Sequence, residues 1–287
     1  MKIAITGSEG FVGSETKKLL KEEGHEVFGF DLMLGGDIRD YKQFDEWIGR
    51  VNPDRILHLA AIARFSDADA DPKLAVETNV IGTANVVAVA KKYHIPLVYS
   101  STGSVYMPIT DYTGTIKETW VAKGNSVYGC TKYQGELYVK EHNPHIILRY
   151  AHLYGKEKRM HGLIGGFVDR IKRGLAPTLY GGKQSNDFTY IKDIAQANYK
   201  ALISPWDKWN QVYNIGTGEE LSAEEAGKII CEFSGWKGEI EVKEGRTVDP
   251  ERFAFDCSKA ERMLGFKAEW KFRDGLKDMF SDDQIKS

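Results

Sequence analysis

The chain has 287 residues, with 39 lysine and arginine residues against 41 aspartate and glutamate residues, and a formal net charge of -2. This balance gives no reason to expect nucleic acid or an anionic membrane as a partner. No apolar run approaches the roughly 20 residues that span a bilayer. The three cysteines are scattered without metal-ligand spacing, and no secretory signal precedes the first strand pattern, so we expect a cytoplasmic protein without a metal site.

Short β-branched runs alternate with helical patterns in the first half of the chain. Helices are expected at residues 11–24, 72–93 and 126–142. The expected strands are "KIAITG", "HEVFGFD", "RILHLA", "PLVYSS" and "HIILRY". This alternation is typical of βαβ units, which build a parallel sheet covered on both faces. We therefore expect an α/β fold, a Rossmann-type doubly wound parallel sheet.

The rhythm becomes irregular after Arg149, where helical patterns cover 163–174 and 192–203 and strands are expected at "NDFTYI" and "QVYNIG". Ser222 and Glu225 have the spacing of a capping box, which predicts a further helix that ends near Gly235. No flexible linker separates the halves. We therefore expect two interleaved domains: residues 1–150 and about 185–217 form the first, and about 151–184 and 218–287 form a smaller α/β domain.

A glycine-rich turn lies between the first strand and the first helix. "ITGSEGFVG" places Gly7, Gly10 and Gly13 at three-residue intervals, which allows a tight turn and a close approach of the backbone to a pyrophosphate. Such turns are common, but this one opens the first βαβ unit. The next strand ends at Asp31, whose carboxylate would accept hydrogen bonds from ribose hydroxyls and repel a 2′-phosphate. The pattern predicts dinucleotide binding, with NAD preferred over NADP.

Tyr128 and Lys132 lie one turn apart on a predicted helix, and therefore on one face. An ammonium beside a phenol lowers the pKa of the phenol, which makes tyrosine a usable proton acceptor near neutrality. With 14 tyrosines in the chain, chance pairs are expected, and Tyr154 and Lys158 are one of them, next to Gly155. The helical context favours the first pair.

These motifs, with "HLAA" and the hydroxyl run "SSTGSVY", resemble the extended short-chain dehydrogenase/reductase superfamily. More narrowly they are similar to NAD-dependent nucleotide-sugar epimerases and dehydratases of the UDP-glucose 4-epimerase type. The stretches "NVIGTANVV", "LRYAHLYG", "NDFTYIKDIAQA", "YNIGTGEELS" and "DCSKAERMLGF" follow in the order of that family. The resemblance covers nearly the whole chain, and it implies NAD as the cofactor, a nucleotide-diphosphate sugar as the substrate and a homodimer.

The resemblance also implies roles for individual residues. Tyr128 corresponds to the catalytic acid/base, Lys132 to the lysine that binds the nicotinamide ribose, and Thr102 to the hydroxyl group on the reacting oxygen of the substrate. The implied cofactor contacts are Gly7, Gly10, Phe11, Val12, Gly13, Asp31, Asp37, Ile38, Leu59, Ala60, Ala61, Ser100, Lys132 and Tyr150. The implied substrate contacts are Thr102, His152, Tyr180, Asn186 and Arg246. Ser100 and Ser101 have a structural interpretation, as strand-end residues, that is equally good.

The two residues that follow Thr102, Gly103 and Ser104, bear on the reaction. Dehydratases of the family resemble "TDEVY" where this chain has Gly103 and Ser104, and the related decarboxylases carry a glutamate in the place of Ser104. Neither residue can supply a titrating acid, which disfavours loss of water and of CO2. The prediction is a UDP-sugar 4-epimerase that oxidises C4 transiently to a 4-keto sugar and returns the hydride to the other face. A 4-ketoreductase or dehydrogenase, an oxidoreductase for another substrate and a non-catalytic NAD(H) sensor stay open.

The substrate motifs depart from the family pattern at two residues. Tyr180 would stack on the base, and Arg246 would pair with the diphosphate through its bidentate guanidinium. Asn186, however, replaces the arginine of the usual "RDF", and His152 replaces the asparagine of "RYFN". The sugar and the base are therefore left open.

Overall fold

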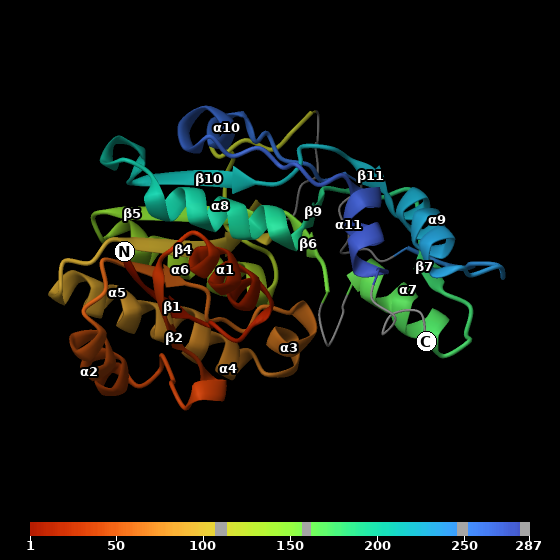
Figure 1. Cartoon of the computed structure of the whole chain (residues 1–287). Coiled ribbons are helices and arrows are strands. Elements are labelled where there is room, and N and C mark those ends of the chain that lie inside the picture. Colours follow the sequence, from red (N-terminus) through yellow and green to blue (C-terminus); the bar gives the residue numbers. More distant parts are fainter. Residues whose placement is uncertain (107–113, 157–161, 246–251, 282–287) are drawn as a thin grey trace.

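The computed structural model describes residues 1–106, 114–156, 162–245 and 252–281, and a parallel sheet forms the centre of its larger part (Figure 1). The six strands are β1 (Lys2–Thr6), β2 (Glu26–Phe30), β3 (Arg55–His58), β4 (Leu97–Thr102), β5 (His145–Tyr150) and β10 (Gln211–Ile215). Their order is β10-β5-β4-β3-β1-β2, and every neighbouring pair is parallel. The chain runs outward from β1 to β2 and then returns past β1 to β3. This reversal is the doubly wound topology, and it confirms the predicted α/β Rossmann-type fold.

Helices cover both faces of the sheet. They are α1 (Phe11–Glu22), α2 (Tyr41–Val51), α5 (Thr83–Lys92), α6 (Val127–Lys140) and α8 (Ile191–Ile203). Successive strand residues point to opposite faces. Ala4 and Ile56 accordingly belong to the core that contains α2 and α5 residues, whereas Ile5 and Leu57 belong to the core that contains α1 and α8 residues. Because both faces are covered, every residue of β4 and β5 is buried.

The predicted helix at 72–93 is built from three segments. Helix α4 (Pro72–Val76) passes through a π-helical turn, η2 (Glu77–Gly82), into α5. The turn was not predicted, because a π-helical turn has no strong local sequence signal. Short elements complete this half: η1 (Leu32–Leu34), α3 (Phe65–Ala70), η3 (Gly103–Tyr106) and η4 (Trp206–Lys208).

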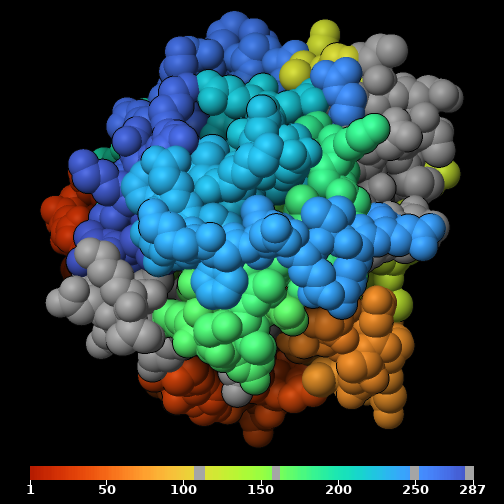
Figure 2. Space-filling model, turned by 90° about the vertical axis from the view of Figure 1, so that its right-hand side faces the viewer, coloured from red at the N-terminus to blue at the C-terminus, as the bar shows by residue number. Residues whose placement is uncertain are grey.

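The second group of elements lies beyond the carboxyl ends of the strands, at the right of Figure 1. It contains β6 (His152–Tyr154), α7 (Gly162–Lys172), β7 (Thr178–Tyr180), β8 (Ser185–Asn186), β9 (Phe188–Tyr190), β11 (Leu221–Ser222), α9 (Ala223–Ser234), β12 (Glu241–Lys243) and α11 (Phe272–Met279). The short strands pair as β6 with β9, β7 with β12, and β8 with β11. Figure 2 shows α7, in green, beside α9 and β12, in blue, on this end of the molecule.

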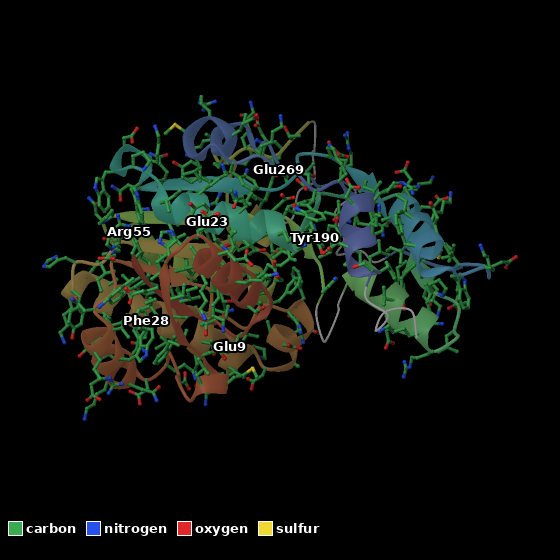
Figure 3. All side chains as sticks on the ribbon, in the orientation of Figure 1. Glu9, Glu23, Phe28, Arg55, Tyr190 and Glu269 are labelled. Atoms are coloured by element: carbon green, nitrogen blue, oxygen red, sulfur yellow. The ribbon has the colours of Figure 1, made fainter. Side chains whose placement is uncertain are left out.

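Side-chain hydrogen bonds join elements that are far apart in the sequence. Within the second group, the hydroxyl of Tyr190 on β9, which is labelled in Figure 3, donates a hydrogen bond to Asp278 of α11. Helix α10 (Ser258–Leu264) lies against β10, where Lys259 donates to the Val212 carbonyl at 2.8 Å. The chain thus crosses between the groups several times, and the predicted division into two domains stays a prediction.

The predicted ends of α9 agree with the structure. Ser222 and Glu225 form a complete capping box, and Gly235 ends the helix in the left-handed conformation. Gly265 ends α10 in the same conformation, but α10 begins without a side-chain cap. In the described part of the chain, no helix is long and apolar enough to cross a membrane.

Candidate active site

The glycine-rich turn lies at the point where the strand order reverses, between β1 and β3. Gly7 has φ +71°, and a Cβ there would lie 2.7 Å from the backbone nitrogen of Ala60. A Cβ on Gly13 would lie 2.1 Å from the carbonyl oxygen of Gly7. Gly10 begins α1 without any side-chain cap, so the first amide groups of the helix have no side-chain acceptor. A pyrophosphate fits this cradle, because its charge is stabilised by free amides and by the positive end of a helix.

A cavity of about 840 Å³ extends from this turn along the carboxyl ends of the strands. All fourteen predicted cofactor contacts line it, together with Thr102, Tyr128 and His152. Tyr180 and Asn186 lie on β7 and β8, outside the described lining. Arg246 and Lys158 lie outside the residues that the structure describes. The structure therefore brings all the predicted cofactor residues together in one cavity, whereas only some of the predicted substrate residues line it.

Two carboxylates from the segment that follows β2 line the cavity. Asp31 follows β2, and its carboxylate accepts from the backbone amides of Glu9 at 3.0 Å and Met33 at 2.9 Å. Asp37 accepts three side-chain hydrogen bonds from Arg39, at 3.0, 2.9 and 2.6 Å, and this pairing lowers the pKa of the Asp37 carboxyl. The positive charge of Arg39 is therefore matched by its own neighbour, which leaves it poorly suited to a 2′-phosphate.

The tyrosine and lysine of α6 reach the other end of the cavity. Ser126 caps the helix, and its hydroxyl accepts from the amide of Gly129 at 3.0 Å. Burial raises the pKa of the Tyr128 phenol, and a hydrogen bond with Thr102 acts in the opposite direction. Nζ of Lys132 lies 4.2 Å from the centre of the Tyr99 ring, and burial lowers the pKa of this ammonium to about 7.

This differs from the expectation that Lys132 lowers the pKa of Tyr128. Helical spacing correctly predicts that the two side chains share a face, but it says nothing of the desolvation that both groups undergo. Burial disfavours the charged form of each group, and so it raises the pKa of the phenol and lowers that of the ammonium.

The stretch after β4 is tightly packed. Thr102 Oγ1 donates to Ser104 Oγ at 3.2 Å and accepts from the Ser104 amide at 3.2 Å. The rings of Phe253 and Phe255 lie against Gly103, where an added Cβ would be 2.3 Å from Cζ of Phe253. An acidic side chain at position 103 is therefore not only missing but has no room unless these rings move.

His152 lines the cavity beside these rings. Its ring stands edge-on to Phe253, with the centroids 5.1 Å apart. Nδ1 of His152 is buried and has no hydrogen-bond partner among the described residues. Burial lowers the pKa of this imidazole to about 4, so it is neutral at physiological pH. A neutral donor or acceptor without a partner is available to a ligand there.

Sequence reasoning assigned no role to Asn79, which holds α6 in place. This buried residue of η2 donates to Thr131 Oγ1 on α6 at 3.0 Å and exchanges two bonds with the backbone of Ile62. Sequence reasoning also missed Phe65, whose ring stands edge-on to that of Tyr128 with the ring centroids 5.3 Å apart. A polar residue on the buried face of a helix was the available signal for Asn79. Among the described residues, no group of acids, histidines and cysteines has the arrangement of a metal site.

The model of the NAD-dependent epimerase/dehydratase family matches residues 3–216. The chain belongs to this family. A protein described as a putative UDP-glucose 4-epimerase from Methanocaldococcus jannaschii is 33% identical, with 96% of each chain covered. UDP-glucuronic acid decarboxylase 6 of Arabidopsis thaliana is 28% identical, over 100% of this chain and 90% of the relative.

Solved structures agree with this assignment. UDP-glucose 4-epimerase from Thermotoga maritima superimposes with a TM-score of 0.90 at 27% identity, covering 99% of both chains. UDP-glucuronic acid 4-epimerase from Bacillus cereus, solved with UDP-glucuronic acid and NAD, gives a TM-score of 0.85 at 27% identity, covering 100% of this chain and 99% of that one. The resemblance to the extended short-chain dehydrogenase/reductase class is thus confirmed, and the chain is an NAD-dependent enzyme of this family.

Proposed function

We propose that the chain is a nucleotide-sugar 4-epimerase that acts on a UDP-sugar. One observation carries this proposal: Tyr128, hydrogen-bonded to Thr102, and Lys132 line one cavity with the dinucleotide cradle, beside a Gly103 packed under aromatic rings. That constellation can move one proton and position one reacting carbon, but it offers no second acid at positions 103 and 104. The named relatives include both epimerases and decarboxylases, and this lack of an acid favours the epimerases.

Each residue of the trio has a separate part in the reaction. Tyr128, as its phenolate, takes the proton from the C4 hydroxyl as the general base, and the resulting phenol later returns that proton. Thr102 donates to the same substrate oxygen and so fixes its position. Lys132 donates to the nicotinamide ribose and, while charged, stabilises the phenolate. NAD, when bound in the glycine-rich cradle, would supply the hydride acceptor for C4, and its reduced form would supply the hydride for return to the other face of the 4-keto sugar.

The remaining substrate contacts are proposals of lower detail. His152 would present its unpartnered nitrogen to an oxygen of the sugar or the diphosphate, as a neutral group. Tyr180 and Asn186, which lie outside the described lining, and Arg246, which lies outside the described residues, stay predictions for the nucleotide.

A homodimer is proposed on different grounds. Ile81 on η2 and Leu137 and Tyr138 on α6 are large apolar or aromatic side chains with 41–49% of their surface exposed, on two helical segments that pack together. A second copy of this chain would cover them. Sedimentation velocity should therefore give the mass of two chains, and substitution of Leu137 by glutamate should give the mass of one. A wild-type monomer would contradict the proposal.

The catalytic proposal is tested with purified protein and pairs of UDP-sugars that differ only at C4. Product analysis should show interconversion of one pair without net change in NADH absorbance, because the hydride returns to the sugar. Release of water or CO2, or stoichiometric consumption of NADH, would contradict epimerisation. A thermal-shift screen of nucleotide sugars identifies the substrate independently, since a ligand that binds the folded state raises the melting temperature by mass action.

A further inference from the structure

Behind the catalytic residues, α6 carries a buried acid that the proposed mechanism does not use. Glu136 is fully buried and lies one helical turn after Lys132. Oε1 of Glu136 accepts from Ser101 Oγ at 2.6 Å and from Arg149 Nε at 2.8 Å, and Oε2 accepts from Arg149 Nη2 at 2.6 Å. This carboxylate therefore joins α6 to the residue that directly precedes Thr102.

Arg149 extends the contact across the sheet. It is 3% exposed on β5, and its Nη1 donates to the hydroxyl of Tyr106 at 2.6 Å. That hydroxyl donates to Oδ1 of Asn214 on β10 at 2.8 Å. The ends of β4, β5 and β10 are thus tied to one carboxylate, which is in turn anchored to α6.

A contribution to stability is a poor explanation for the buried ion pair of Glu136 and Arg149. Removing two charges from water costs several kcal/mol for each ion, and apolar residues of similar volume are often at least as stable. What apolar residues cannot provide is a fixed negative charge near Lys132. The groups that interact with the Lys132 ammonium are the ring of Tyr99 on β4, His58 on β3 and Glu136 on α6. Of these, Glu136 is the carboxylate.

Lys132 needs such a charge because of its own burial. It is 3% exposed, and desolvation lowers the pKa of the ammonium to about 7, while attraction to the Glu136 carboxylate acts to raise it. A lysine that binds a ribose hydroxyl and stabilises a phenolate must be protonated.

We propose that Glu136 is a positioning residue that keeps Lys132 protonated and holds the Thr102 end of β4 against α6, with Arg149 as its anchor. It acts through other side chains and does not touch the substrate. The proposal rests on the proposed roles of Thr102 and Lys132. Its test must therefore be independent of turnover.

The decisive measurement is an NMR titration of the full-length protein labelled at lysine side chains, with the Lys132 signal assigned by its loss in Lys132→Met. In Glu136→Gln the pKa of Lys132 should fall by about one unit, because an opposite charge nearby shifts a pKa by that order. Asp193→Asn is the matched control. Asp193 is equally buried, but its carboxylate accepts from the backbone amides of Glu269 and Trp270, so this variant should leave Lys132 unchanged.

Removing one partner of a buried ion pair can unfold a protein, so a second variant accompanies the first. Glu136→Gln combined with Arg149→Met removes both members of the buried ion pair. Lys140, which also pairs with Glu136 at 3.6 Å, is partly exposed and stays hydrated. This double variant should lower the Lys132 pKa as well. A Lys132 pKa that stays the same in both folded variants would overturn the proposal. With turnover established, Glu136→Gln should lower kcat above neutral pH with little change in KM. If the Lys132 pKa falls in both variants but the wild-type protein has no epimerase activity, the proposed function is contradicted and the role of Glu136 is not.

Discussion

At the scale of single residues, Tyr128 and Tyr154 show how the same spacing leads to different chemistry. Each is followed four residues later by a lysine. Tyr128 lines the cavity and bonds to Thr102, whereas Tyr154 is buried between the rings of Tyr190 and Phe272. The hydroxyl of Tyr154 donates to the carbonyl of Phe272 at 3.2 Å. One phenol is available to a substrate, and the other ties β6 to the start of α11 within the second group of elements.

Replacing each tyrosine by phenylalanine separates these roles. Tyr128→Phe should lower kcat by about 10²- to 10⁴-fold, because it removes the general base. Its dissociation constant for NAD, measured by calorimetry, should stay within about twofold, since the ring remains. Tyr154→Phe should leave kcat nearly unchanged and lower the melting temperature by a few degrees, as the loss of one buried hydrogen bond costs about 1 kcal/mol. Substantial activity in Tyr128→Phe would remove this residue from the mechanism.

At the scale of elements, the entry into α1 depends on backbone contact rather than on side chains. The helix begins at Phe11 without a side-chain cap, and the turn packs so closely that Gly13 touches the backbone of Gly7 and Ser8. The glycine turn therefore leaves amides free at the start of α1 and also lets α1 approach β1 closely.

A single added methyl group tests this packing. Gly13→Ala would place its Cβ 2.1 Å from the Gly7 oxygen, so the turn must move, and we expect NAD affinity to fall by tenfold or more. Gly166→Ala is the matched control, because it lies inside α7 with no atom within 4 Å of the added Cβ. The control should bind NAD normally and be more stable by about 0.5–1 kcal/mol. Calorimetry and urea unfolding measure both, and equal NAD binding by the two variants would contradict the role of the turn.

The elements also show which features the sequence could predict. The six strands of the parallel sheet, the glycine turn and the capping box of Ser222 depend on neighbouring residues, and all of these were predicted. Pairings such as β7 with β12 join segments more than sixty residues apart, and no local pattern determines them. No local pattern determines the contact of Gly103 with Phe253 or the ion pair of Glu136 with Arg149 either. The raised pKa of Tyr128 was not predicted for a related reason, since burial is a property of the assembled cavity.

At the scale of the whole molecule, His58 links the sheet to the helical layer and makes stability depend on pH. The side chain is fully buried on β3, with Nδ1 2.7 Å from Thr6 Oγ1 on β1 and Nε2 3.0 Å from Thr83 Oγ1 on α5. Burial, with a smaller contribution from Lys132, lowers the pKa of this imidazole well below its usual 6.5. The folded protein therefore holds His58 neutral.

The sign of the effect follows from proton uptake. Below about pH 6.5 the unfolded chain binds a proton at His58 that the folded chain does not, so the free energy of unfolding falls as the pH falls. For one such group the loss between pH 7 and pH 5 is about 2 kcal/mol. We expect His58→Gln, whose amide can still bond to both threonines, to be less stable at pH 7 and to have a flatter pH dependence by about that amount.

Urea unfolding at pH 5, 6 and 7 measures this difference directly. His94→Asn is the control, because His94 is exposed and asparagine tolerates its positive φ of 55°. The other buried groups, including Asp193, whose pKa is raised by burial to about 6 and which acts in the opposite direction, are common to all three proteins and cancel in the comparison. Parallel pH curves for wild type and His58→Gln would show that His58 takes up its proton in the folded state. The packing between β3 and α5 would then open enough for His58 to be protonated without unfolding of the protein.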